Sequence, residues 1–183
     1  WVHYASGHVP TEATPAPLDG PRRMREGEHV TLVSNSYTTL EAMQAAEALE
    51  AQGCNVELFD LRVLRPLKLD AIVESVHKTG HLVTVDTGFQ EYGIGAEICS
   101  EVTSRAFSSL KQAPVRLGLP SHPTPSSRSL AAAYYPRSPH IAARIGELLG
   151  MRPDSVDKAT AWLKEQRENL PLDQPHPTFR GPF

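Results

Sequence analysis

Segments with the pattern of a strand alternate with segments with the pattern of a helix between residues 22 and 150. In the helical segments apolar residues recur every three or four positions, as Leu69, Ile72 and Val76 do. The strand segments are short, and some are almost entirely apolar, which is typical of strands buried on both faces of a sheet. This alternation predicts an α/β fold in which a mostly parallel sheet is covered by helices on both sides.

Turn and capping residues set the limits of these segments. The expected strands are residues 22–34, as two short strands that turn at Gly27, then 55–60, 81–86 and 114–119, and the expected helices are residues 38–53, 69–80, 94–107 and 138–150. In the first helix, the apolar stripe is predicted to be Leu40, Met43, Ala46 and Leu49. In the last helix, we expect Ser138 at the N-cap.

Composition divides the chain into three parts. These are a proline-containing linker or arm in residues 1–21, a domain in residues 22–150, and a helix followed by a proline-rich tail in residues 151–183. The pattern after residue 150 places Val156, Thr160 and Leu163 on one helix face. We expect that face to pack back on the domain or to join a dimer interface.

Charge and cysteine content narrow the functional classes. The formal net charge of -3 gives no reason to expect a nucleic-acid or membrane surface, because both need concentrated basic residues. The two cysteines, Cys54 and Cys99, have no metal-ligand spacing and fit thiols in a reducing compartment. We therefore expect a cytoplasmic location, or the mitochondrial matrix in a eukaryote. Because the chain starts at Trp1, we expect a fragment or a processed product.

The turn between the second expected strand and the first expected helix contains Ser34, Asn35 and Ser36. Such strand-to-helix turns are where α/β folds bind ligands. Because the turn lacks the glycines of a phosphate cradle, helix capping is the favoured interpretation. Anion binding by these three residues is the alternative.

Glycines and carboxylates share the later turn in residues 86–95. Gly93 and Gly95 lack the third glycine of a dinucleotide fingerprint, so tight packing of the helix on its strand is favoured over ligand binding. Asp86 and Glu91 would need pKa values that differ to act as an acid/base pair.

Histidines and serines form no convincing reactive set. His77 and His81 lack an evident third metal ligand, and His77 suits the last turn of a helix. Ser126 and Ser127, beside His122, lie in a proline-stiffened loop without the G-x-S-x-G turn of a nucleophile. We therefore predict no metal site and no catalytic residue.

Two long stretches carry a family resemblance. They are "DLRVLRPLKLDAIVESVHKTGHLVTVDTGFQEYGIGAEI" and "APVRLGLPSHPTPSSRSLAAAYYP". Together they resemble the C-terminal domain of the β subunit of thiamine-diphosphate-dependent 2-oxo acid dehydrogenase first components, of the pyruvate, branched-chain and acetoin types. The fold is that of the transketolase C-terminal domain, and the resemblance runs from about Pro10 to Leu149.

The resemblance implies a three-layer α/β/α domain with a mixed, mostly parallel five-stranded sheet whose first strand is antiparallel. It also implies that thiamine diphosphate and Mg²⁺ are held by the α subunit and the preceding half of the β subunit, so that no cofactor-binding residue is expected in this chain.

The segment that matches the family's signature corner begins at Asp60. Within this corner, apolar contacts are expected from Leu61, Val63, Leu64 and Leu67. Arg62 and Arg65 are then free to bind carbonyls, carboxylates or a neighbouring chain.

In the family, this domain helps β subunits to dimerise and docks the complex to its acyltransferase core. The family's acidic docking position is Gln112 here, preceded by Lys111, and about thirty residues follow the helix whose terminal carboxylate often takes part. These differences predict weak docking. The leading hypothesis is an assembly domain of such an oxidoreductase; the alternative is an anion-binding regulatory domain of a transketolase-like sugar enzyme.

Overall fold

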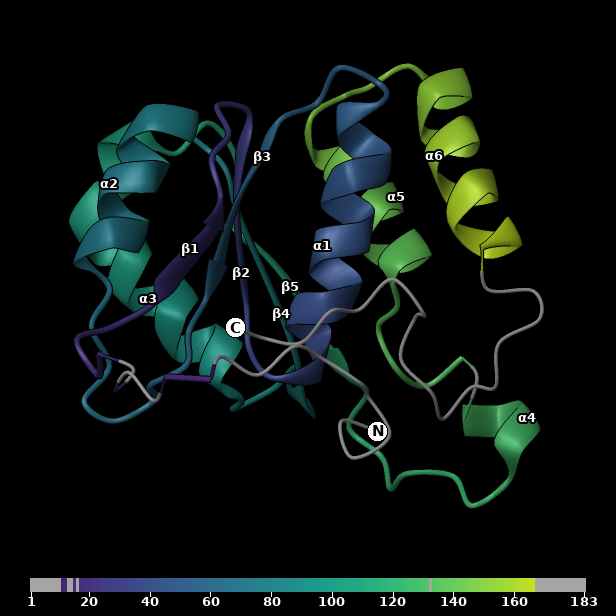
Figure 1. The fold of residues 1–183 in the computed structure, drawn as a ribbon, viewed down its shortest axis with the longest axis horizontal. Coiled ribbons are helices and arrows are strands. Elements are labelled where there is room, and N and C mark those ends of the chain that lie inside the picture. Colours follow the sequence, from purple (N-terminus) through teal and green to yellow (C-terminus); the bar gives the residue numbers. More distant parts are fainter. Residues whose placement is uncertain (1–10, 13–14, 16, 132, 167–183) are drawn as a thin grey trace.

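A five-stranded sheet lies between two layers of helices in the computed structural model, which describes residues 11–12, 15, 17–131 and 133–166 (Figure 1). The strands are β1 (Arg22–Arg25), β2 (Val30–Ser34), β3 (Val56–Asp60), β4 (Leu82–Phe89) and β5 (Val115–Leu119). The helices are α1 (Tyr37–Glu50), α2 (Asp70–Thr79), α3 (Ile94–Ala106), the 3-10 helix η2 (Phe107–Ser109), α4 (Arg128–Ala131), α5 (Ser138–Leu148) and α6 (Pro153–Glu165). The α/β/α class is confirmed.

The sheet has the order β1-β3-β2-β4-β5. β2, β3, β4 and β5 run parallel to one another, whereas β1 pairs antiparallel with β3. The mixed sheet with an antiparallel first strand is therefore confirmed. β1 and β5 are the two edge strands, and β2 lies in the centre.

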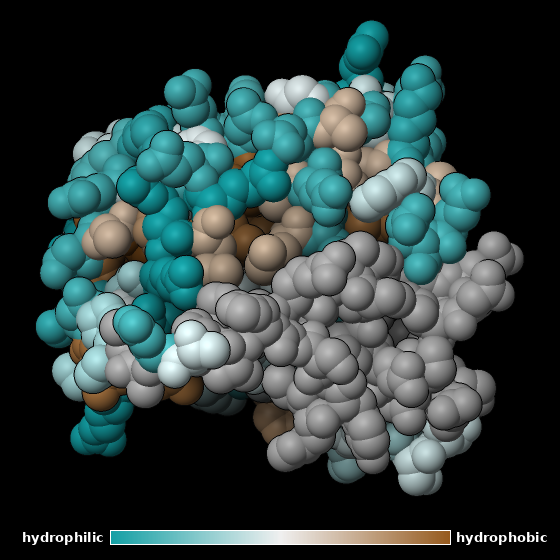
Figure 2. All heavy atoms as spheres, viewed as in Figure 1, coloured by the Kyte–Doolittle hydropathy of each residue, from teal (hydrophilic) through white to brown (hydrophobic). Residues whose placement is uncertain are grey.

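Two hydrophobic clusters fill the space on the two faces of the sheet. The described residues visible in Figure 2 are mostly hydrophilic (teal), with hydrophobic ones (brown) showing between them. Side chains alternate along a strand, so neighbouring residues of β2 serve different clusters: Leu32 packs toward α1 and α5, and Val33 packs toward α2 and α3. On the second face, Ile72 and Val76 of α2 are completely buried, as their spacing predicts.

Two details of the expected helices were wrong. In α1, Met43 is 43% exposed, and the buried face consists largely of alanines, among them Ala42 and Ala45. Alanine carries too little hydrophobicity to mark the stripe clearly in the sequence, but its small size lets α1 approach the sheet. In α5, the N-cap is Arg137, and Ser138 is the first helical residue.

Helix α6 packs against α5 and α1, beside them at the edge of the fold in Figure 1. Ala159 and Leu163 are each 1% exposed and belong to the cluster that contains β2 and α5. Gly146 permits this approach, because a Cβ there would lie 2.4 Å from a methyl carbon of Val156. The core therefore continues past residue 150. Residues 1–10 of the expected arm and 167–183 of the expected tail lie outside the described residues.

The two cysteines are free thiols. Burial raises the pKa of Cys54 to about 11, and burial also raises the pKa of Cys99. Both thiols are therefore protonated and poor nucleophiles at neutral pH. None of the helices in the described part of the chain is long and apolar enough to cross a membrane.

Candidate functional site

The carboxyl ends of β2, β3 and β4 lie along one edge of the sheet, where folds of this kind bind ligands. Asp60 ends β3, and Asp86 lies near the end of β4. Burial raises the pKa of both carboxyl groups. Hydrogen bonds oppose this effect, from Thr39 to Asp60 and from the backbone of Gly88 to Asp86. This carboxyl edge is therefore the candidate region for ligand binding or catalysis.

Several polar groups of the turn after β2 form hydrogen bonds within the protein. The Ser34 hydroxyl is buried and lies 3.1 Å from the carbonyl oxygen of Phe59, to which it donates. Thr38 donates to the carbonyl oxygen of Asn35 at 2.8 Å. Asn35 is half-buried, and Ser36 is exposed with a φ of 49°. Anion binding at Ser34, Asn35 and Ser36 stays a prediction. Of the three, Ser34 is the least accessible to an anion, because its hydroxyl is buried and already hydrogen-bonded.

The corner after β3 is anchored by fewer residues than expected. Leu61 is 2% exposed, and Leu67 packs against the cluster formed with α2 and α3. Leu64, in contrast, is 50% exposed, and Val63 is only half-buried. The expectation that Leu64 anchors the corner was therefore wrong. The corner bulges outward between its two anchors, and this places Leu64 at the surface.

The two arginines of the corner have different surroundings. Arg62 has a φ of 53°, and its guanidinium donates a hydrogen bond to the carbonyl oxygen of Pro17. Its charge also lowers the pKa of Asp60, against the larger effect of burial. Arg65 is exposed. Binding of a partner by Arg62 and Arg65 stays a prediction, and Arg65 has the freer side chain.

The glycines after β4 have the packing role that the sequence favoured. A Cβ at Gly95 would lie 2.7 Å from the hydroxyl oxygen of Thr84, so α3 could not rest on β4 at its present distance. A Cβ at Gly93 would lie 2.2 Å from the carbonyl oxygen of Phe89. In the same loop Glu91 is exposed, whereas Asp86 is buried.

Lys111 and Gln112 cap two helices on opposite faces of the sheet. The Lys111 ammonium donates to the carbonyl oxygen of Thr79, at the end of α2, at 3.1 Å. The Gln112 amide donates to the carbonyl oxygen of Leu148, at the end of α5, at 2.9 Å. The last carbonyl groups of a helix lack partners within the helix, so both bonds stabilise helix ends. Partner binding by these two residues stays a prediction.

The histidines lie in different environments. His77 is exposed, and its Nδ1 lies 2.7 Å from the Ser109 hydroxyl. His81 is buried, and its Nδ1 has no hydrogen-bond partner among the described residues. In the described ranges, no three His, Cys, Asp or Glu side chains are grouped to hold a metal ion. His122 packs against Tyr134, whose hydroxyl donates to the carbonyl oxygen of His122.

Burial and the nearby charge of Lys111 lower the pKa of His81 below its ordinary value. The unfolded chain takes up a proton here near about pH 6.5, while the folded chain resists it, so stability is retained above that pH and is lost below it. We expect the free energy of unfolding to fall on this account as the pH is lowered from about 7 to about 5. Urea melts of the natural chain and of His81→Gln across this range measure the difference. His77→Gln is the matched control, and an unchanged slope in His81→Gln would contradict the assignment.

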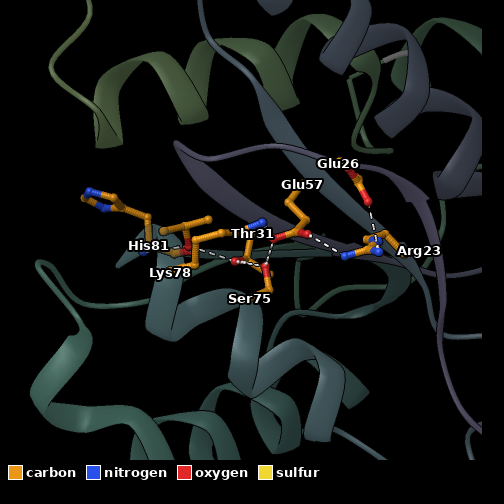
Figure 3. A network of polar contacts seen from close by, with 8 residues as sticks. Arg23, Glu26, Thr31, Glu57, Ser75, Lys78 and His81 are labelled. Carbon is orange, nitrogen blue, oxygen red and sulfur yellow. Dashed lines mark hydrogen bonds and ion pairs between the residues drawn. The ribbon is translucent and has the colours of Figure 1, made fainter.

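Glu57, which the sequence pattern did not single out as a functional residue, is 1% exposed in β3 (Figure 3). Its carboxylate accepts hydrogen bonds from Ser75 at 2.5 Å and from Arg23 at 3.4 Å, and it forms an ion pair with Lys78 at 2.7 Å. Thr31 extends the network, with its hydroxyl 2.7 Å from that of Ser75. A cleft of about 480 Å³ opens between β1 and α2 beside this network. The available signal was a glutamate in the interior of the strand segment "VELFD", between apolar residues.

A second buried ion pair joins α1 to the start of α5. Glu41 accepts from the Tyr37 hydroxyl at 2.6 Å and from the backbone amide of Ser138 at 2.8 Å. Arg137 lies 3.1 Å from the same carboxylate, and its guanidinium is 5.4 Å from the centre of the Tyr37 ring. Glu41 thus satisfies an amide of the first turn of α5 from a neighbouring helix. These contacts hold α1 and the start of α5 together.

Comparison with known sequences decides the family. The family model described as "Transketolase, C-terminal domain" matches residues 21–141, which is more than half of the chain. The chain belongs to this family. The match covers all five strands of this transketolase C-terminal domain and ends inside α5, so α6 lies beyond it.

Relatives of this transketolase C-terminal domain include the mitochondrial pyruvate dehydrogenase E1 component subunit beta of Caenorhabditis elegans. The two are 38% identical over 136 residues, which are 74% of this chain and 39% of the relative. The beta subunit of the acetoin:2,6-dichlorophenolindophenol oxidoreductase of Cupriavidus necator is 36% identical over 138 residues, which are 75% of this chain and 40% of the relative.

A solved structure gives the same picture. A split-gene transketolase, described as an inactive beta4 tetramer, superposes with a TM-score of 0.63 and 25% identity, over 78% of this chain and 45% of its own. This transketolase C-terminal domain therefore spans less than half of the length of each of these relatives.

Proposed function

We propose that this transketolase C-terminal domain is the assembly and dimerisation domain of the β subunit of a thiamine-diphosphate-dependent 2-oxo acid dehydrogenase. The parent complex would carry out the oxidative decarboxylation of a 2-oxo acid. The observation that carries the proposal is the similarity, over about three quarters of the chain, to beta subunits of the pyruvate and acetoin enzymes.

The described side chains are consistent with a supporting role. Ser34, Asp60 and Asp86 at the carboxyl edge are held by hydrogen bonds within the domain. The buried carboxylates Glu57 and Glu41 are likewise engaged by donors from neighbouring elements. We propose that thiamine diphosphate and Mg²⁺ are bound by the α subunit and by the parts of the β subunit that this chain does not span.

The proposed partners are the α subunit, the remainder of the β subunit, a second copy of this domain and the acyltransferase core. The compartment would be the cytoplasm, or the mitochondrial matrix in a eukaryote. We expect docking to the core to be weak. Lys111 and Gln112 lack the acidic charge of the family, and each would have to give up a helix-capping bond to contact a partner through the same atoms.

The full chain is expected to self-associate in solution. Multi-angle light scattering over a range of protein concentrations should show a dimer fraction that rises with concentration. Calorimetric titration with thiamine diphosphate and Mg²⁺ should be flat, because the cofactor site is placed elsewhere. A chain that stays monomeric at every concentration, or that binds thiamine diphosphate at micromolar levels, would contradict the proposal.

The alternative is an anion-binding regulatory domain of a transketolase-like sugar enzyme. The similarity to the split-gene transketolase favours it, together with the exposed Ser36 and half-buried Asn35 in the turn after β2. Thermal melting with and without sugar phosphates separates the two functions. A rise in melting temperature that is lost in Asn35→Ala supports the alternative, and no rise supports the assembly domain.

A further inference from the structure

An exposed basic surface with apolar side chains lies beside β1 and the corner after β3. It comprises Leu18, Arg22, Leu64, Arg65 and Lys68, all of them exposed, and we call it the corner patch. Cations gather here although the whole chain has a net charge of -3.

Several contacts bring the parts of the corner patch together. Arg22 is the register partner of Asp60, the residue that starts the corner. Gly20 faces Lys68, since a Cβ on Gly20 would lie 3.4 Å from the Cβ of Lys68. The hydrogen bond from Arg62 to Pro17 fixes the residue before Leu18 against the corner. The segment before β1 and the loop between β3 and α2 accordingly run close together at the lower left of Figure 1.

The three cations of the patch are unsatisfied within the described part of the chain. Arg22, Arg65 and Lys68 make no ion pair and no side-chain hydrogen bond with any described residue, whereas Arg23 and Arg25, in the same strand as Arg22, both have glutamate partners. Two carboxylates lie near these cations: Asp60, which is half-buried and whose pKa is lowered by the charges of Arg62 and Arg22 against the larger effect of burial, and Asp19, which is exposed. With Arg62 included, four cations outnumber these two carboxylates. The outward-facing charge of the patch is therefore positive.

The corner patch combines exposed apolar side chains with cations, as protein–protein interfaces do. Leu18 is 76% exposed and Leu64 is 50% exposed. In the sequence, Leu64 precedes Arg65, so an apolar side chain and a cation face solvent side by side. An apolar anchor that is buried on binding supplies affinity, and charges at its rim select the partner and speed association.

We propose that the corner patch binds an acidic segment of another protein chain, in which carboxylates flank an apolar side chain. This inference rests on the proposed assembly function and names the chemistry of one partner. It differs from docking through Lys111 and Gln112, which lie at the opposite, amino-terminal edge of the parallel strands and are engaged in capping helices.

A fluorescein-labelled peptide in which leucines alternate with pairs of glutamates tests the proposal by fluorescence anisotropy with the full chain. Arg65→Glu/Lys68→Glu should weaken binding by roughly ten- to a hundredfold, because two charged contacts are reversed. Leu64→Ala should weaken it by several-fold, and added salt should weaken it further. Thermal melts should show that these exposed substitutions leave the fold intact.

The matched control is Lys158→Glu/Lys164→Glu, which makes the same change of net charge on the exposed face of α6. We expect it to leave peptide binding within about twofold. The same peptide with glutamines in place of glutamates should not bind. Equal losses in the two double variants, or no preference for the glutamate peptide, would overturn the proposal.

Light scattering separates this proposal from the proposed function. The corner variant is expected to self-associate like the natural chain while failing to bind the peptide. If the natural chain does not self-associate but binds the peptide through the patch, the corner patch stands and the dimerisation proposal fails. If the corner variant loses self-association, the patch is occupied by a second copy, and the proposal of an acidic partner segment is overturned.

Discussion

Replacing Arg137 by Met is expected to lower the free energy of unfolding by about 3–5 kcal/mol. The side chains of Arg137 and Glu41 are 8% and 3% exposed, and they lie 3.1 Å apart. Without the guanidinium, the Glu41 carboxylate would remain buried and would lose its ion pair with Arg137. The Tyr37 hydroxyl and the Ser138 amide would still donate to it, but neither carries a positive charge. Urea melts monitored by circular dichroism measure the loss.

Arg144→Met is the matched control for this prediction. Arg144 pairs with Glu147 on the surface of α5, where water screens the charges, so its loss should cost about 1 kcal/mol or less. Arg137→Met/Glu41→Gln should recover part of the stability, since a neutral amide then replaces the carboxylate that formed the ion pair with Arg137. Equal losses in the two arginine variants would show that the buried pair contributes no more than a surface pair.

The largest loss from an apolar truncation in the corner is expected at Leu61. Leu61→Ala should cost about 2–5 kcal/mol, because Leu61 is 2% exposed and its removal leaves a cavity between β3 and α2. Chemical denaturation of the purified variant measures this loss.

Leu64→Ala removes the same number of atoms from the same corner. Since Leu64 is 50% exposed, we expect a loss of about 1 kcal/mol or less. Should Leu64→Ala prove the more damaging of the two, the corner would be anchored differently in solution, and the exposed position of Leu64 in the corner patch would be wrong.

The sequence was a good guide to elements whose periodicity is strong. The i, i+3, i+7 spacing of Leu69, Ile72 and Val76 placed α2 and its buried face correctly. The stripe in α1 was harder to identify, because its buried face is made of alanines, which contrast weakly with polar neighbours. Met43 has a more apolar side chain and drew the prediction to the wrong face.

Side-chain contacts between segments that are far apart in the sequence could not be predicted from a local sequence pattern. Glu41 and Arg137 are 96 residues apart, and neither residue alone signals a buried partner. In the corner, "LRVL" has two leucines in an apolar context that suggest anchoring at each, but the chain turns there, and the turn decides which leucine faces inward. Gln112 lies next to an expected strand, and its contact with Leu148 depends on where α5 ends in space.

The helix-capping hydrogen bonds of Lys111 and Gln112 couple the two helix layers of the domain. The two residues are adjacent in the chain, yet one holds the end of α2 and the other the end of α5, in the two opposite layers of the domain. Fraying of either helix end would pull on the segment that enters β5 and so disturb the other end. In many proteins helix ends open independently of one another. Here the ends of α2 and α5 are coupled, because adjacent residues of the chain bind both of them. The two helix layers should therefore unfold as a single cooperative unit, because Lys111 and Gln112, just before β5, connect them across the edge of the sheet.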